Sequence, residues 1–88
     1  MPKFQPIFAP RFLDDQAYWR NTNPRTAAKV VELVKACLEC PFTGLGKPEP
    51  LRHGWLKGCW SRRITKEHRL LYKVDEGAVN FLTCRYHY

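Results

Sequence analysis

The sequence predicts an α+β fold, with two N-terminal helices packed on one face of a small, mostly antiparallel sheet. Apolar residues recur at helical spacing in the first half of the chain and alternate with polar residues in the last third. The predicted order is strand, helix, helix, loop and three strands, so one sheet face can bury both helix stripes. The 88 residues suffice for a single domain, spanning 1–88, with one modest core.

The first predicted elements are a short strand and a helix. Residues 3–9 alternate loosely between apolar and polar, and Pro6 restricts this strand to the edge of a sheet. Residues 11–21 predict a helix with two acids near its start and Trp19 directed toward the core. Asn23-Pro24 then ends this helix.

A second, amphipathic helix is predicted over residues 24–38. Asn23 is a favoured N-cap, and Pro24 is a favoured first helical residue because its missing N–H is not needed there. The spacing i, i+3, i+4, i+7 predicts a buried stripe that consists of Ala27, Val30, Val31, Val34, Cys37 and Leu38.

The second half of the chain predicts a loop and three strands. Residues 42–56 are rich in Gly and Pro, which is typical of a surface loop with stiff sections. Strands are predicted over 58–64, 67–74 and 79–88, and Asp75-Glu76-Gly77 forms a tight turn between the last two.

Period-two alternation predicts which side chains share a face of these strands. If the helices cover the more apolar face, Arg69 and His87 emerge together on the open face. Arg63 joins them if its strand pairs in a compatible register. Arg62 then points to the opposite face, toward the helices or a partner.

The net charge of +7 favours a polyanionic partner. Residues 1–44 hold six Lys/Arg against four acids, whereas residues 45–88 hold nine against four. A solubilising surface is the alternative explanation for such an excess. No apolar run is long enough to span a bilayer, and no secretion signal is evident, so we expect a cytoplasmic protein with reduced thiols and no membrane partner.

Glu49 is the most informative acid because prolines flank it on both sides. The prolines stiffen the backbone, so the carboxylate is well aimed and suits a general base. The alternative is an ordinary salt bridge to nearby arginines. Carboxylates do not cluster as magnesium binding requires, and we expect neither a metal nor a cofactor.

Cationic side chains that suit a phosphodiester substrate surround this acid in the sequence. Arg63 and Arg69 can each donate two parallel hydrogen bonds to phosphate oxygens and stabilise charge in a transition state. Lys47 and Arg52 fit contacts to neighbouring phosphates. Isolated arginines on strands are also commonly solvated or paired.

The C-terminal residues supply an imidazole and an aromatic ring. His87 has the ordinary pKa range of a general acid near neutrality and could protonate a departing 5′-oxygen. Tyr88 could stack on a base or bind a phosphate. The alternative for both is a frayed chain end.

Three segments of the chain together resemble the YoeB (Txe/YoeB) toxins of bacterial type II toxin–antitoxin modules, which are relatives of RelE. The resemblance runs from about Asp14 to the C-terminus. It is densest in residues 46–53, 60–71 and 84–88, which read GKPEPLRH, WSRRITKEHRLL and CRYHY.

The resemblance implies a RelE-like fold and a small endoribonuclease that cuts mRNA in the ribosomal A site. It places the general base on Glu49, the phosphate-stabilising arginines on Arg63 and Arg69, the acid on His87 and a terminal aromatic on Tyr88. The implied partners are the ribosome, a cognate antitoxin and a second copy in a homodimer. Two alternatives stay open at this point: a gyrase-inhibiting, ParE-like toxin and a nucleic-acid-binding module without catalysis.

Overall fold

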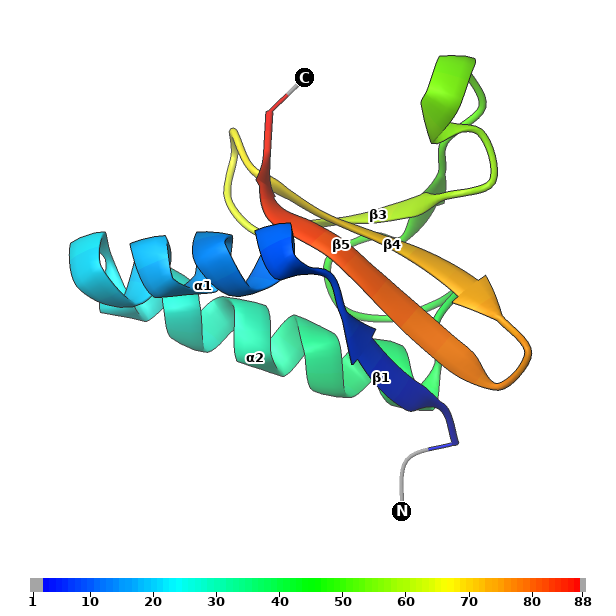
Figure 1. The fold of residues 1–88 in the computed structure, drawn as a ribbon, viewed down its shortest axis with the longest axis horizontal. Coiled ribbons are helices and arrows are strands. Elements are labelled where there is room, and N and C mark those ends of the chain that lie inside the picture. The colour runs from blue at the N-terminus through cyan, green and yellow to red at the C-terminus, as the bar shows by residue number, and fades with distance from the viewer. Residues whose placement is uncertain (1–2, 88) are drawn as a thin grey trace.

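The computed structural model describes residues 3–87. Both helices lie on the same side of the sheet (Figure 1). In chain order the elements are β1 (Gln5–Phe8), α1 (Pro10–Thr22), α2 (Pro24–Glu39), β2 (Glu49–Pro50), the 3₁₀ turn η1 (Gly54–Leu56), β3 (Trp60–Arg63), β4 (Arg69–Asp75) and β5 (Ala78–Tyr86).

The sheet has five strands in the order β1-β5-β4-β3-β2. Strand β1 pairs parallel to β5, and the other pairs are antiparallel. The predicted architecture is therefore confirmed. Each outer strand contains a proline, Pro6 in β1 and Pro50 in β2, as expected for strands whose outer side needs no ladder partner.

The break between the helices follows the sequence prediction. Pro24 begins α2, and the Asn23 side chain accepts a hydrogen bond from the Thr26 N–H at 3.3 Å. The N–H of Asn23 also donates to the Trp19 carbonyl at 2.7 Å, which closes α1. One residue thus caps both helices and fixes the corner between them.

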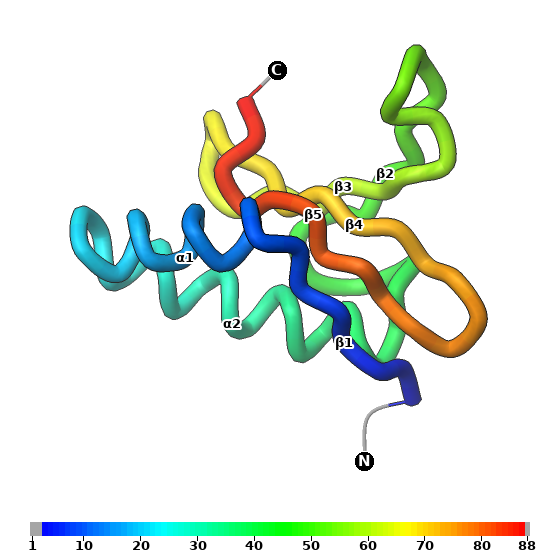
Figure 2. Tube along the Cα trace, in the orientation of Figure 1, coloured from blue at the N-terminus to red at the C-terminus, as the bar shows by residue number. Residues whose placement is uncertain are grey.

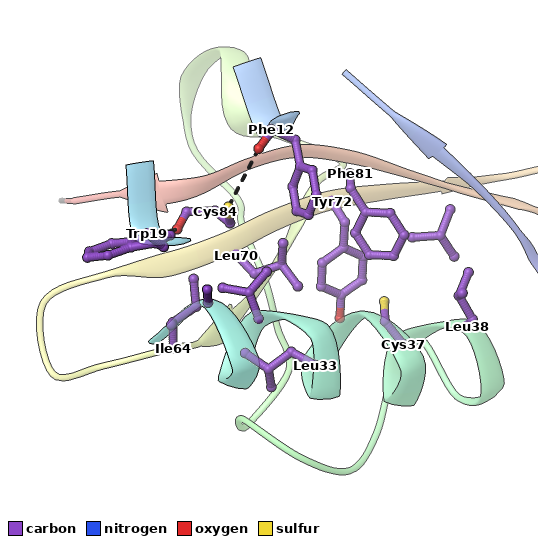
Figure 3. Close-up of a cluster of buried hydrophobic side chains, with 13 residues drawn as sticks. Phe12, Trp19, Leu33, Cys37, Leu38, Ile64, Leu70, Tyr72, Phe81 and Cys84 are labelled. Atoms are coloured by element: carbon purple, nitrogen blue, oxygen red, sulfur yellow. Dashed lines mark hydrogen bonds between the residues drawn. The ribbon is translucent and has the colours of Figure 1, made fainter. Parts of the chain in front are cut away.

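The core lies between the two helices and the inner face of β4 and β5 (Figure 3). Its centre on α2 is Leu33, which is fully buried, whereas Val31 of the predicted stripe is 44% exposed. The predicted stripe is otherwise confirmed: Ala27, Val30, Cys37 and Leu38 are buried, and Val34 packs against the core. On α1, the Trp19 Nε1–H donates to the Cys84 carbonyl at 2.8 Å and so joins this helix to β5.

Strand β5 contains irregularities that the period-two prediction missed. Its register against β4 shifts on both sides of Leu71. Phe81 and Cys84, three residues apart, consequently both belong to the core. Beyond the shifts, Arg69 pairs with Tyr86. The prediction that Arg69 and His87 share the open face is therefore wrong, because Tyr86 is the strand partner of Arg69 and His87 follows the end of β5.

A further correction concerns the segment that was predicted as a loop over residues 42–56. Glu49 and Pro50 form the short edge strand β2, with Glu49 opposite Ser61 and Pro50 opposite Trp60. Among residues 3–87, no helix has the length and apolar character that a membrane span requires.

Candidate active site

Glu49, Arg63 and Arg69 lie on the sheet face opposite the helices. Directly paired residues of antiparallel strands share a face, and so do residues two apart on one strand. Glu49 pairs with Ser61, and Arg63, two residues further along β3, pairs with Arg69. Because Leu70 of β4 points into the helix-covered core, Arg69 and its partners occupy the open face.

The order of the strands sets the spacing across this face. Strand β2, which carries Glu49, is separated from β5 by β3 and β4. Three strand spacings amount to about 14 Å between backbones. Arg63 and Arg69 stand on the two intervening strands. The carboxylate therefore lies on one side of a pair of cations, and the end of β5 lies on the other.

Glu49 is exposed. Within residues 3–87 its carboxylate makes neither a hydrogen bond nor an ion pair, and the ion pair found in that range joins Arg11 to Asp15 at 3.9 Å. The salt-bridge alternative for Glu49 is thus not observed. An exposed carboxylate held on a paired strand can accept a proton from a bound substrate.

Arg62 anchors the segment that leads to Glu49. The side chain is completely buried on the helix side of β3. Its Nε–H donates to the Tyr72 hydroxyl at 3.2 Å and its Nη1 to the Leu45 carbonyl at 2.7 Å. Its Nη2 donates to the carbonyls of Cys40 and Thr43. The guanidinium therefore ties residues 40–45 to the sheet.

Gly46 adds a close packing contact to this anchor. It has a φ of 84°, and a Cβ there would lie 2.8 Å from Cδ2 of Leu33 on α2. Its carbonyl accepts a hydrogen bond from the Arg63 N–H at 2.7 Å. The next residue, Lys47, has a φ of 52°, which is unusual for a side chain other than glycine. The turn before Glu49 is thus tightly packed between α2 and β3.

The two arginines of the open face differ in how they are held. Arg63 is exposed. The Nη1 group of Arg69 lies within hydrogen-bonding distance of the carbonyls of Thr65, Lys66 and His68, at 3.1, 3.4 and 3.3 Å. The β3–β4 turn therefore fixes the direction of the Arg69 guanidinium, while the Arg63 side chain extends into solvent.

His87 follows the end of β5 and is exposed. Its ring centroid lies 6.0 Å from that of His68, which contacts Trp19 edge-on at 4.9 Å. His68 has a buried Nδ1 that finds no hydrogen-bond partner within the described part of the chain. His87 therefore lies near Arg69, but it does not belong to the set of paired strand residues that carries Glu49, Arg63 and Arg69. Tyr88 lies outside the described residues.

A pocket of about 220 Å³ connects the β2–β3 segment with the end of β5. It is lined by Leu51, Arg52, His53, Leu56 and Tyr86. Figure 2 shows the segment around η1 and the C-terminal end of β5 projecting from the same side of the sheet, away from the helices. The predicted phosphate contact Arg52 lines this pocket. Lys47 is exposed two residues before Glu49.

Sequence reasoning missed Arg62 and Tyr86 as parts of the site. Strand alternation did place Arg62 on the helix side of the sheet. Its burial was not predictable, because nothing in the sequence shows that the backbone carbonyls of residues 40–45 need hydrogen-bond donors. Tyr86 was assigned to the core face because alternation cannot reveal a register shift. Among residues 3–87, His, Cys, Asp and Glu form no group of three or more that could hold a metal ion.

Several solved structures that are similar to this fold are bacterial toxins. The YoeB/ParE toxin from Agrobacterium tumefaciens superposes with a TM-score of 0.89 at 39% identity, covering 97% of this chain and 100% of that one. The Staphylococcus aureus YoeB dimer superposes with a TM-score of 0.86 at 36% identity, covering 98% of this chain and 99% of that one. The YoeB–YefM complex from the same organism superposes with a TM-score of 0.83 at 37% identity, covering 97% of this chain and 98% of that one. The fold therefore places this chain in the class of RelE-like toxins.

Sequence comparison narrows this class to a family. The family model for the YoeB-like toxin of bacterial type II toxin–antitoxin systems matches residues 8–88. Toxin YoeB of Escherichia coli strain K12 is 49% identical over 82 residues, which are 93% of this chain and 96% of that relative. The chain belongs to the YoeB family of type II toxins.

Proposed function

We propose that this chain is a ribosome-dependent mRNA endoribonuclease that cuts without a metal ion and thereby inhibits translation. The observation that carries the proposal is the shared open face of Glu49, Arg63 and Arg69, on which an exposed carboxylate stands beside two cations. Membership of a toxin family supports a harmful activity of this kind.

The proposed reaction is an in-line transesterification. Glu49 accepts the proton of a ribose 2′-hydroxyl, and the 2′-oxygen attacks the adjacent phosphorus. The bond to the 5′-oxygen breaks, and His87 protonates that oxygen as it leaves. The products are a 2′,3′-cyclic phosphate and a 5′-hydroxyl end. Glu49 comes from β2 and His87 follows the end of β5, on the other side of β3 and β4, so a ribose-phosphate linkage can lie between base and acid.

Cationic side chains stabilise the charge that builds up during this reaction. Arg63 and Arg69 stabilise the pentacovalent phosphorane, Arg69 from a position held by the β3–β4 turn and Arg63 from an exposed one. Lys47 and Arg52 bind the neighbouring phosphates, and Tyr88 stacks on a base. The ribosomal A site orients the mRNA, so cleavage of free RNA is slow.

The partners follow from the same proposal. The Staphylococcus aureus relative forms a complex with YefM and a dimer. We extend both kinds of assembly to this chain: a cognate antitoxin that silences it in the cytoplasm, and a homodimer. The basic charge of the chain favours an acidic antitoxin segment.

The test is brief induction in bacterial cells followed by mapping of mRNA 5′ ends. Wild type is expected to produce new 5′ ends within translated codons, and Glu49→Gln, Arg69→Ala and His87→Ala each to reduce them. Glu32→Gln, which alters an exposed acid on α2, is the matched control and retains cleavage. Undiminished cleavage in all three site variants refutes the assignment. Growth arrest without new 5′ ends points instead to a gyrase-directed toxin.

A further inference from the structure

Trp55 is exposed to an unusual degree. Its exposed fraction is 77%, the highest among the exposed large apolar side chains of residues 3–87. The other tryptophans are covered: Trp19 lies in the core, and Trp60 packs against Phe42 with ring centroids 4.8 Å apart. An indole left in water next to a candidate active site calls for a partner.

The backbone around Trp55 is ordered by its own hydrogen bonds. Trp55 is the middle residue of η1. The N–H of Lys57 donates to the Gly54 carbonyl at 3.2 Å, and the N–H of Cys59 donates to the Leu56 carbonyl at 2.9 Å. Leu56 is half-buried and lines the pocket beside Tyr86. The turn thus directs one apolar side chain inward and leaves its neighbour in solvent.

The charge around Trp55 identifies the kind of partner. Residues 50–66 contain no Asp or Glu and five Lys/Arg, of which Arg62 is buried and the other four are exposed: Arg52, Lys57, Arg63 and Lys66. Arg52 and Lys57, on either side of Trp55, are both exposed. A second copy of this loop would bring like charges together. A polyanion that also offers flat aromatic faces fits both properties, and single-stranded RNA is such a polyanion.

We propose that residues 52–57, here called the Trp55 loop, form a nucleobase-stacking site for unpaired RNA. Trp55 stacks on one base, and Arg52 and Lys57 neutralise the phosphates on either side of it. The site lies next to the pocket that Leu56 and Tyr86 line, so the base belongs to RNA near the bond that is cut. The placement of this base near the bond that is cut rests on the proposed function. Every base has a π-face, so the contact tolerates any sequence.

The proposal is tested by binding in a Glu49→Gln background, in which the RNA is not consumed. The probes are a fluorescein-labelled, mixed-sequence single-stranded oligoribonucleotide and ribosomes carrying an mRNA. Trp55→Ala is expected to weaken binding of one or both probes about 5- to 100-fold. Trp55→Phe keeps most of the affinity, whereas Trp55→Leu, apolar but without a ring, behaves like Trp55→Ala. Because Trp55 contacts little, its variants should keep the wild-type thermal midpoint.

Leu13→Ala is the matched control, since Leu13 is 54% exposed on α1. This variant is expected to bind as tightly as the parent. Equal affinity of Trp55→Ala and the parent for both probes overturns the proposal, and so does full affinity of Trp55→Leu. A loss confined to binding of the antitoxin assigns the loop to a protein partner and also overturns it. These measurements need no cleavage, so a failed nuclease assay refutes the proposed function while leaving the binding result intact.

Discussion

Arg63 stands directly opposite Arg69 across the β3–β4 pair. Like charges at directly opposed positions destabilise an antiparallel sheet by roughly 0.2–1 kcal/mol. The arrangement becomes favourable when an anion lies between the two guanidinium groups, because each can then donate charge-assisted hydrogen bonds. We therefore expect the pair to lower the stability of the protein without a bound anion and to raise its affinity for a phosphate group.

The first prediction concerns this pair. Arg63→Thr is expected to leave the free energy of unfolding unchanged or to raise it by about 0.5 kcal/mol, while cleavage falls at least about 100-fold. Added phosphate, at constant ionic strength, should stabilise wild type more than the variant in urea unfolding. Lys73→Thr, an exposed cation on the same strand as Arg69, is the control. An equal phosphate effect in all three proteins contradicts the prediction.

Arg62 gives a second prediction. Arg62→Lys keeps the charge but cannot donate to the Tyr72 hydroxyl and three carbonyls at once, so buried acceptors lose their donors. We expect a loss of about 2–4 kcal/mol in the free energy of unfolding. Urea denaturation measures it. Arg63→Lys, at the exposed neighbour, should change stability by less than about 0.5 kcal/mol. Similar values for both variants would mean that the buried bonds contribute little.

A third prediction separates backbone strain from crowding at two glycines. Gly46→Ala meets Leu33 at 2.8 Å, whereas a Cβ at Gly58 has nothing within 4 Å; both have positive φ, 84° and 94°. Gly58→Ala should cost about 1 kcal/mol from conformation alone. Gly46→Ala should cost about 1–3 kcal/mol more because of overpacking. Thermal or urea unfolding gives the difference. We also expect Gly46→Ala to lose more cleavage activity than Gly58→Ala, because Gly46 sets the turn before Glu49.

The buried thiols predict how stability depends on alkaline pH. Burial raises the pKa of Cys37 from 9.0 to about 11 and that of Cys84 to about 12. The unfolded thiols ionise first, so their stabilising contribution is complete below about pH 9 and is lost as the pH rises toward 11–12. The free energy of unfolding should therefore fall from pH 8 to pH 11. Cys37→Ala should weaken this slope, and Cys40→Ser, at an exposed thiol, should not. A slope unaffected by Cys37→Ala would exclude this cause.

Much of the fold could be predicted because its signals are local. Asn23-Pro24 separates the helices within one residue of the predicted position, and the turn before Ala78 joins two strands as expected. The pairing of Glu49 with Ser61 was not predictable, since a single residue between two prolines carries no strand signal of its own. Tertiary contact with β3 forms that strand, in the way that context commonly overrides propensity.

The candidate site was predictable in part for the same reason. The strand alternation correctly put Arg69 on the open face and Arg62 on the other. It failed for β5, because the two register shifts beside Leu71 interrupt the alternation, so that Phe81 and Cys84 both enter the core while Tyr86 lies opposite Arg69. A shift depends on side chains from two strands and from α1, such as Asp15, which accepts a hydrogen bond from the Thr83 hydroxyl. No single-strand pattern contains that information.

The prolines of the two outermost strands have a consequence for self-association. A free strand edge invites an incoming chain to extend the sheet, and this is a common route to domain swapping and fibrils. Here one margin is four residues long and the other two, and each lacks an amide proton at Pro6 or Pro50. β-Augmentation is therefore discouraged at both margins.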